Sequence, residues 1–345
     1  MRLINSAVVL AALLVTAPAM AQSGPIAPPN LSRYVSASSL SQADLASIKA
    51  YIDREAPRLA SDVPADAVQA RTKLVGELQS RTRRVSPLFR EQYTALLEPH
   101  LRALMAGDNL SAAVMAAQVA GTLGTDGAVK MLTDRIDPKD EPRMAVRVWA
   151  AGGVGTLTAM PTVSERRTTR ALRSLAIACC EEPDWAVRRR MILSMANAMA
   201  NQRGQDASQN AVRDAAIEQL AQAMADTLQD IASGQAQFVQ TLPIATTELQ
   251  STLLTAGDDD TRTAIADAVV PVLARGHDAI LQSWDSIRQD PRSLAAAARF
   301  LDESELLLTI LTQSDPTDAQ LSKAVLDGNR RPVETAARRW AAHRG

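Results

Sequence analysis

The chain has few aromatic side chains, few histidines and almost no cysteine. Its 345 residues include four Trp, three Tyr, three Phe, three His and two Cys. Strands favour aromatic and β-branched residues, so the scarcity of aromatics in a sequence rich in Ala and Leu favours helices. An enzyme cleft that stacks sugars usually needs many aromatic side chains, and few are present.

The two cysteines are adjacent, which excludes a disulfide-stabilised scaffold. Cys179 shares helical spacing with Leu172, Leu175 and Ala176, so we predict that it is a small core residue. Cys180 points about 100° away around the same helix. We interpret it either as a reactive thiol or as a residue that forms an intermolecular bridge.

Motifs of the common catalytic and nucleotide-binding classes are missing. The chain lacks H-E-x-x-H, G-x-S-x-G, G-x-x-x-x-G-K-[ST] and a G-x-G-x-x-G after a strand. We predict no metal and no other cofactor, and interpret His100, His277 and His343 as surface or helix-end residues. The run Asp258–Asp260 lacks the register of an EF-hand and is placed to begin a helix, where the dipole favours acids.

The first residues have the three parts of a secretory signal peptide. Arg2 precedes an apolar run from Ala7 to Thr16, and Ala19-Met20-Ala21 follows as a small-x-small cleavage site. The run is shorter than the roughly 20 residues that cross a bilayer. We therefore predict that residues 1–21 are removed and that the protein is periplasmic or extracellular, with no transmembrane segment.

A helical domain is predicted from residue 40 to residue 345, after a linker at 22–39 that is rich in Pro, Ser and Gly. Ser41 precedes Asp44 by three residues, the spacing of a capping box, and Ser86-Pro87 is typical of a helix start. Beyond these, we predict helices at 110–123, 126–136, 143–157, 163–180, 184–200, 209–232, 237–255, 260–274, 277–288, 292–314, 318–326 and 332–342.

Two stretches 41 residues apart share the pattern E-P-x-x-A-V-R. They are EPRMAVRVWAAGGVG from Glu141 and EPDWAVRRRMILSMA from Glu182, and each runs into an apolar helical stripe. A helix with one stripe must bury it against a partner, which ERRTTRALRSLAIACC between them supplies. The glycines of AGGVG are interpreted as close helix packing or a turn. Burial between helices is predicted for Val146, Trp149, Val154, Val187, Ile192 and Met195.

Three segments resemble HEAT-type helical repeats: VMAAQVAGTLGTDGAVKML, AVRVWAAGGVG and DWAVRRRMILSMA. That family often opens a helix with D-x-x-V-R, which Asp184, Val187 and Arg188 match, whereas Arg143 and Ser111 stand in the Asp place of the other two. The resemblance is clearest over residues 108–200. It implies an all-α fold in which antiparallel helix pairs stack as an α-solenoid; the alternative is an irregular helical bundle.

A basic patch lies between Arg143 and Arg190. It holds nine arginines against Glu165, Glu181, Glu182 and Asp184, a local net charge of 9 − 4 = +5, whereas the whole chain has a net charge of −1. The overall balance does not indicate a nucleic-acid binder. We interpret the patch as a binding strip for an anionic partner, or alternatively as a solvated face. The predicted binding residues are Arg147, Arg166, Arg170, Arg173, Arg188 and Arg189.

Together these features favour a secreted or periplasmic helical-repeat scaffold for protein–protein interaction, without enzymatic activity. The alternative is an all-helical extracellular hydrolase or lyase that acts on a polysaccharide through a carboxylate site. A concave cleft with two close acids of shifted pKa would favour that alternative.

Overall fold

The computed structural model describes residues 31–79, 84–201, 207–255, 259–316 and 320–344, and every regular element in these ranges is a helix. The predicted all-α class is therefore confirmed. The predicted signal peptide and Asp258 lie outside the described residues, and the signal peptide stays a prediction. Within the described ranges, no helix has the length and apolar character needed to span a bilayer.

Fifteen α-helices follow one another in the described part of the chain. Their bounds are α1 (Gln42–Glu55), α2 (Pro64–Gly76), α3 (Pro87–Ala106), α4 (Leu110–Ala120), α5 (Asp126–Thr133), α6 (Met144–Thr158), α7 (Glu165–Glu181), α8 (Trp185–Asn201), α9 (Ala207–Ala232), α10 (Leu242–Thr255), α11 (Asp259–Gln282), α12 (Trp284–Gln289), α13 (Pro291–Thr312), α14 (Leu321–Leu326) and α15 (Arg330–Arg339). Short 3₁₀-helices stand at Leu31–Arg33, Ala56–Ala60, Ala236–Thr241 and Trp340–His343.

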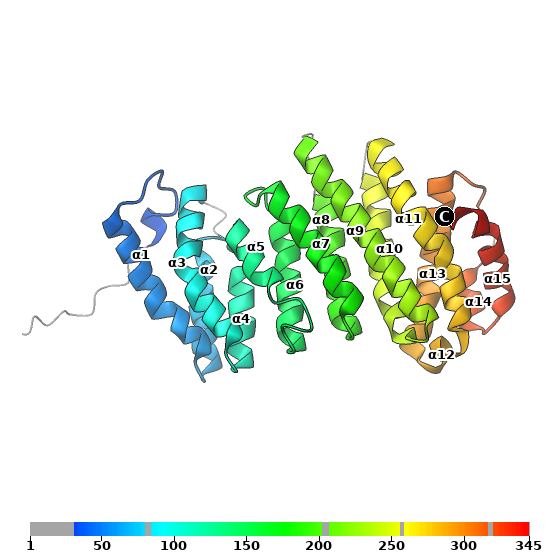
Figure 1. Cartoon of the computed structure of the whole chain (residues 1–345), viewed down its shortest axis with the longest axis horizontal. Coiled ribbons are helices and arrows are strands. Elements are labelled where there is room, and N and C mark those ends of the chain that lie inside the picture. Colours follow the sequence, from blue (N-terminus) through cyan, green and yellow to red (C-terminus); the bar gives the residue numbers. More distant parts are fainter. Residues whose placement is uncertain (1–30, 80–83, 202–206, 256–258, 317–319, 345) are drawn as a thin grey trace, which may run out of the picture.

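The helices form a long row, from α1 at one end to α15 at the other (Figure 1). From α1 to α9, each helix packs against the helix two places further along; α10 then packs against α13 and α11 against α15, so the row has two layers. The first layer contains α1, α3, α5, α7, α9, α11 and α15, and the second contains α2, α4, α6, α8, α10 and α13. The hydrophobic core runs between the layers along the described chain.

Polar caps fix where several helices begin. The Ser41 hydroxyl accepts from the Asp44 backbone N–H while the Asp44 carboxylate accepts from that of Ser41, so the predicted capping box is confirmed. Ser164 caps α7, because its hydroxyl accepts from the backbone N–H of Arg167. Asp184 caps α8 by accepting from two backbone N–H groups, whereas Arg143 at the equivalent place before α6 makes no side-chain cap.

The predicted core of α6 and α8 is confirmed except at one residue. Val146, Val154, Val187, Ile192 and Met195 are fully buried, but Trp149 is 44% exposed. The buried stripe of α6 runs through Val146, Ala150, Val154 and Leu157. Since position 149 lies beside this stripe rather than on it, the indole faces outward.

The glycines of AGGVG permit close packing, as predicted, and lie within α6. A Cβ atom on Gly155 would lie 2.6 Å from the Cβ of Ser194 on α8, and one on Gly153 would lie 2.6 Å from Leu132 and 3.3 Å from the Cα of Gly121. The backbones of α4, α6 and α8 can therefore approach one another because side-chain atoms are missing at these places.

Two predicted boundaries are wrong. The linker expected at 22–39 does not extend through Leu31, Tyr34 and Val35, which are buried in the core. The break expected between residues 274 and 277 is absent, and α11 continues through Gly276. The Phe300 ring lies 2.7 Å from where a Cβ of Gly276 would stand, so this glycine makes room for a side chain rather than a turn.

Candidate functional site

The arginine of each E-P-x-x-A-V-R stretch is an internal cross-link. Arg147 is 4% exposed and donates to the Glu182 carboxylate from Nε at 2.7 Å and from Nη2 at 2.9 Å. Its Nη1 donates to the backbone oxygen of Glu141 at 2.8 Å. This bidentate geometry is the strong form of an arginine–carboxylate pair.

Arg188 makes a similar set of contacts in the second E-P-x-x-A-V-R stretch. It is 2% exposed, donates to the Asp230 carboxylate at 2.6 Å, and donates to the backbone oxygen of Glu182 at 3.0 Å. Its guanidinium also lies over the Phe238 ring at 3.7 Å. Both arginines thus hold a backbone oxygen six residues earlier and an acid 35 or 42 residues later, so the shared motif makes the same contacts twice.

The prediction of a surface role is therefore wrong for Arg147 and Arg188. Their charges are inside the protein and are neutralised by Glu182 and Asp230, so they cannot attract a partner from solution. The first glutamate of the motif is likewise internal. Burial by itself raises the pKa of Glu141, but Arg143 and the charge of Arg135 outweigh burial and lower it.

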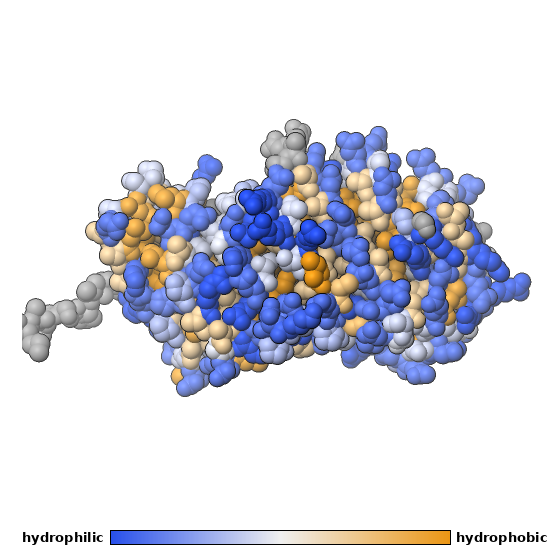
Figure 2. Space-filling view, in the orientation of Figure 1, coloured by the Kyte–Doolittle hydropathy of each residue, from blue (hydrophilic) through white to orange (hydrophobic). Residues whose placement is uncertain are grey.

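Three other predicted residues do form a surface group. Arg166, Arg170 and Arg173 are all exposed, and their spacing of four and three places them on one face of α7. We call this group the arginine strip. Figure 2 shows strongly hydrophilic side chains gathered where Figure 1 labels α7. No carboxylate of the described residues lies within 4 Å of the strip, and Ile177, 57% exposed, continues its row by one turn.

Arg189 is exposed but does not join the arginine strip. It lies on α8, in the second layer, whereas α7 belongs to the first. The interpretation of Arg189 as part of one binding strip with Arg166, Arg170 and Arg173 is therefore wrong, because consecutive helices alternate between the two layers.

The cysteines are not activated as nucleophiles. Cys179 is buried, which confirms its core position, and burial raises its pKa to about 12. The side chain of Cys180 is exposed, yet partial burial of the thiol and a hydrogen bond to Asp226 raise its pKa to about 12 as well. Because the thiolate is the reactive form, the interpretation of Cys180 as a reactive thiol loses its support.

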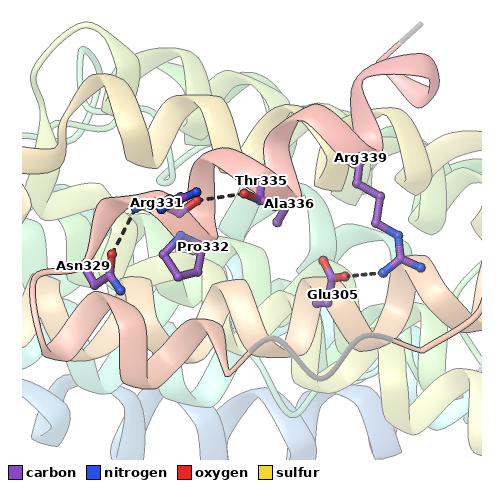
Figure 3. A pocket seen from close by; sticks show the side chains of 7 residues that line it. All are labelled: Glu305, Asn329, Arg331, Pro332, Thr335, Ala336 and Arg339. Atoms are coloured by element: carbon purple, nitrogen blue, oxygen red, sulfur yellow. Dashed lines mark hydrogen bonds and ion pairs between the residues drawn. The ribbon is translucent and has the colours of Figure 1, made fainter.

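A pocket of about 340 Å³ lies between α13 and α15 (Figure 3). Glu305 points into it from α13, and the other side is lined by Asn329, Arg331, Pro332, Thr335, Ala336 and Arg339. Glu305 is only 8% exposed. It accepts from Trp340 Nε1 at 2.6 Å and from Arg339 Nη1 at 3.2 Å, and His277 Nε2 lies 3.6 Å away.

The interpretation of His277 as a surface or helix-end residue is wrong, because its side chain is fully buried beside Glu305. Burial by itself raises the pKa of Glu305, but His277, Trp340 and Arg339 outweigh it and lower this pKa from 4.5 to about 2. The carboxylate is thus held ionised and joins α11, α13 and the C-terminal segment.

Comparison with known proteins identifies no family. No family model and no curated protein matches the chain. Two engineered proteins with crystal structures from the Northeast Structural Genomics Consortium are similar in structure. One is 14% identical with a TM-score of 0.33, covering 74% of this chain and 97% of its own; the other is 18% identical with a TM-score of 0.31, covering 86% and 80%. At such scores the likeness supports no functional argument.

The surroundings of Glu305 do not favour the hydrolase alternative. A general acid needs a raised pKa at neutral pH, and the pKa of Glu305, which lines two neighbouring pockets, is lowered. The pKa of Glu91 is raised, by burial and by the charge of Asp126, but Glu91 lines neither of these pockets. In the ranges that the structure describes, no three His, Cys, Asp or Glu side chains are grouped to hold a metal.

We expect Glu305→Gln to remove an acid-sensitive part of the stability. Since the folded-state pKa is depressed, the ionised carboxylate stabilises the fold above pH 4.5, and this contribution is lost as pH falls from 4.5 towards 2. The variant should be roughly 3 kcal/mol less stable than wild type at pH 7, and the gap should close near pH 2. Denaturant titrations at several pH values measure it. A constant gap would contradict the assignment, and the exposed Glu218→Gln serves as the matched control.

Proposed function

We propose that the protein is an exported, non-enzymatic α-solenoid of HEAT type that binds a protein partner. The solenoid is supported by the two-layer row, in which each helix from α1 to α9 packs on the one two places along, and by the motif whose arginines make the same contacts twice. Such rows present extended surfaces that suit protein recognition. Export is supported by the signal-peptide pattern of residues 1–21.

The arginine strip carries the proposal that the partner is anionic. Three exposed positive charges follow one face of α7, and no described carboxylate within 4 Å neutralises them. Like charges at helical spacing repel each other and stabilise nothing in the chain itself. A surface of this kind attracts an acidic partner, and Ile177 adds an apolar contact at one end.

Reversing two charges of the strip, in the variant Arg170→Glu/Arg173→Glu, should weaken the binding of an acidic protein. We expect at least a tenfold loss for a labelled poly-glutamate probe in low salt. The difference should vanish in strong salt, because the Debye length falls from about 10 Å at 0.1 M to about 3 Å at 1 M. Binding is measured by fluorescence anisotropy, and circular dichroism checks that both proteins remain helical.

The matched control reverses two exposed arginines elsewhere, in the variant Arg262→Glu/Arg292→Glu. It changes the net charge of the protein by the same amount. Equal losses in the two variants would mean that only total charge matters, and unchanged binding in the strip variant would make the strip a solvated face. The natural partner is then sought by capture from the exported fraction, with the strip variant as the reference.

A further inference from the structure

The outer surface of α4, α6 and α8 has an unusual composition. Charged residues make up 22% of the chain, yet α4 has none and α6 has only the buried Arg147. In α8 the charged residues are Arg188, which is buried, Arg189 and Arg190. These three neighbouring helices of the second layer therefore offer solvent two arginines and no carboxylate, among apolar and small side chains.

Trp149 is the aromatic anchor of this surface. Eight of the ten aromatic side chains are buried, and Trp185 is half-buried, whereas Trp149 is 44% exposed on α6. The exposed part of this indole can bury further apolar area when a partner covers it. Tryptophan and arginine are the residues most enriched where binding energy concentrates in interfaces.

Arg190 belongs to α8, and its guanidinium lies over the bare backbone of α6 at Gly152. Gly152 is about one helical turn from Trp149. A Cβ atom on Gly152 would lie 2.3 Å from Nη2 and 2.4 Å from Nε of Arg190, so the guanidinium occupies the space that a side chain would fill. The arginine is half-buried. Within the described chain it has no ion pair and its side chain donates no hydrogen bond, so its donors remain available to a ligand.

We propose that this surface, Trp149, Gly152, Arg189 and Arg190, docks an acidic peptide segment of a protein partner. An apolar side chain of the peptide covers the Trp149 indole, and a neighbouring carboxylate takes a paired hydrogen bond from Arg190, the geometry in which a guanidinium binds most strongly. Arg189 adds a second positive charge. The absence of carboxylates from α4, α6 and α8 means that nothing on these helices repels the peptide.

This docking surface belongs to the second layer, whereas the arginine strip belongs to the first. It therefore goes beyond the proposed function, and the two can be tested separately. A partner with one acidic segment would use one surface. A partner able to reach both would gain from linked binding, because the second contact then becomes intramolecular.

The test uses the mature chain and a fluorescent peptide of alternating Glu and Leu, measured by anisotropy. We expect Trp149→Ala and Arg190→Ala each to weaken binding at least tenfold, and Arg190→Lys to recover only part of it, because Lys cannot make the paired bond. Because Trp149 is exposed, Trp149→Ala should leave the helical content unchanged. The variant Arg166→Ala/Arg170→Ala/Arg173→Ala should lose much less affinity for this peptide than Trp149→Ala does, because the strip offers no indole for the Leu side chains; an equal loss would place the peptide on the strip.

Three further outcomes would overturn the proposal. One is undiminished binding by Trp149→Ala and Arg190→Ala. Another is equal binding of a peptide with Gln in place of Glu, which would show a merely apolar surface. The third is equal competition by short single-stranded DNA, which would show that any polyanion suffices. If Arg190→Ala does not fold, Gly152→Ala supplies the second variant, since its added methyl group must displace the guanidinium and lower affinity.

Discussion

Replacing Arg147 with Ala is expected to lower the free energy of unfolding by about 3–5 kcal/mol. The change would leave the Glu182 carboxylate, which is 0% exposed, buried without the guanidinium that donates two hydrogen bonds to it. The backbone oxygen of Glu141 would lose its donor as well. Denaturant unfolding followed by helical circular dichroism at pH 7 measures the loss.

The same substitution at Arg166, which is exposed on α7, is the matched control and should change stability by less than about 0.5 kcal/mol. The double variant Arg147→Met/Glu182→Leu should recover much of the loss, because a buried ion pair can often be replaced by apolar side chains of similar size. If Arg147→Ala proves as harmless as Arg166→Ala, the ion pair between Arg147 and Glu182 does not stabilise the fold.

Replacing Ile192 with Ala is expected to cost about 2–5 kcal/mol. Ile192 is fully buried in the core stripe of α8, so the truncation leaves a cavity that close-packed neighbours fill only in part. Ile177→Ala removes the same atoms from a side chain that is 57% exposed on α7 and should cost little. Equal losses at the two positions would mean that α8 presents a different face to the core.

Helical periodicity was sufficient to predict the helices and most of the core. Val146, Ala150, Val154 and Leu157 recur at helical spacing and so mark one face of α6, and local caps such as Ser41 need only their neighbours in sequence. Close packing at Gly153 and Gly155 was also foreseeable, because three glycines in an otherwise apolar helix weaken it unless a neighbour uses the space.

Long-range partners were beyond the reach of the same argument. Arg147 was predicted at the surface as one of the nine arginines of the basic patch, and its acid partner lies 35 residues away. A signal existed: Glu and Arg stand at the same offset in both E-P-x-x-A-V-R stretches, which indicates one paired structural use. His277 was misplaced because Gly276 was interpreted as a turn, and only the packing of Phe300 shows otherwise.

Gly121, Gly153 and Gly155 act on the shape of the whole row. They set the spacing of α4, α6 and α8 by backbone contact, while the first layer has no equivalent glycine series in α5, α7 or α9. A methyl group added at Gly155 would push α6 and α8 apart in the second layer only. The row would then curve, with its two ends bending towards the first layer. Curvature, and with it the distance between remote surface residues, can therefore be retuned by a single added carbon atom far from either end.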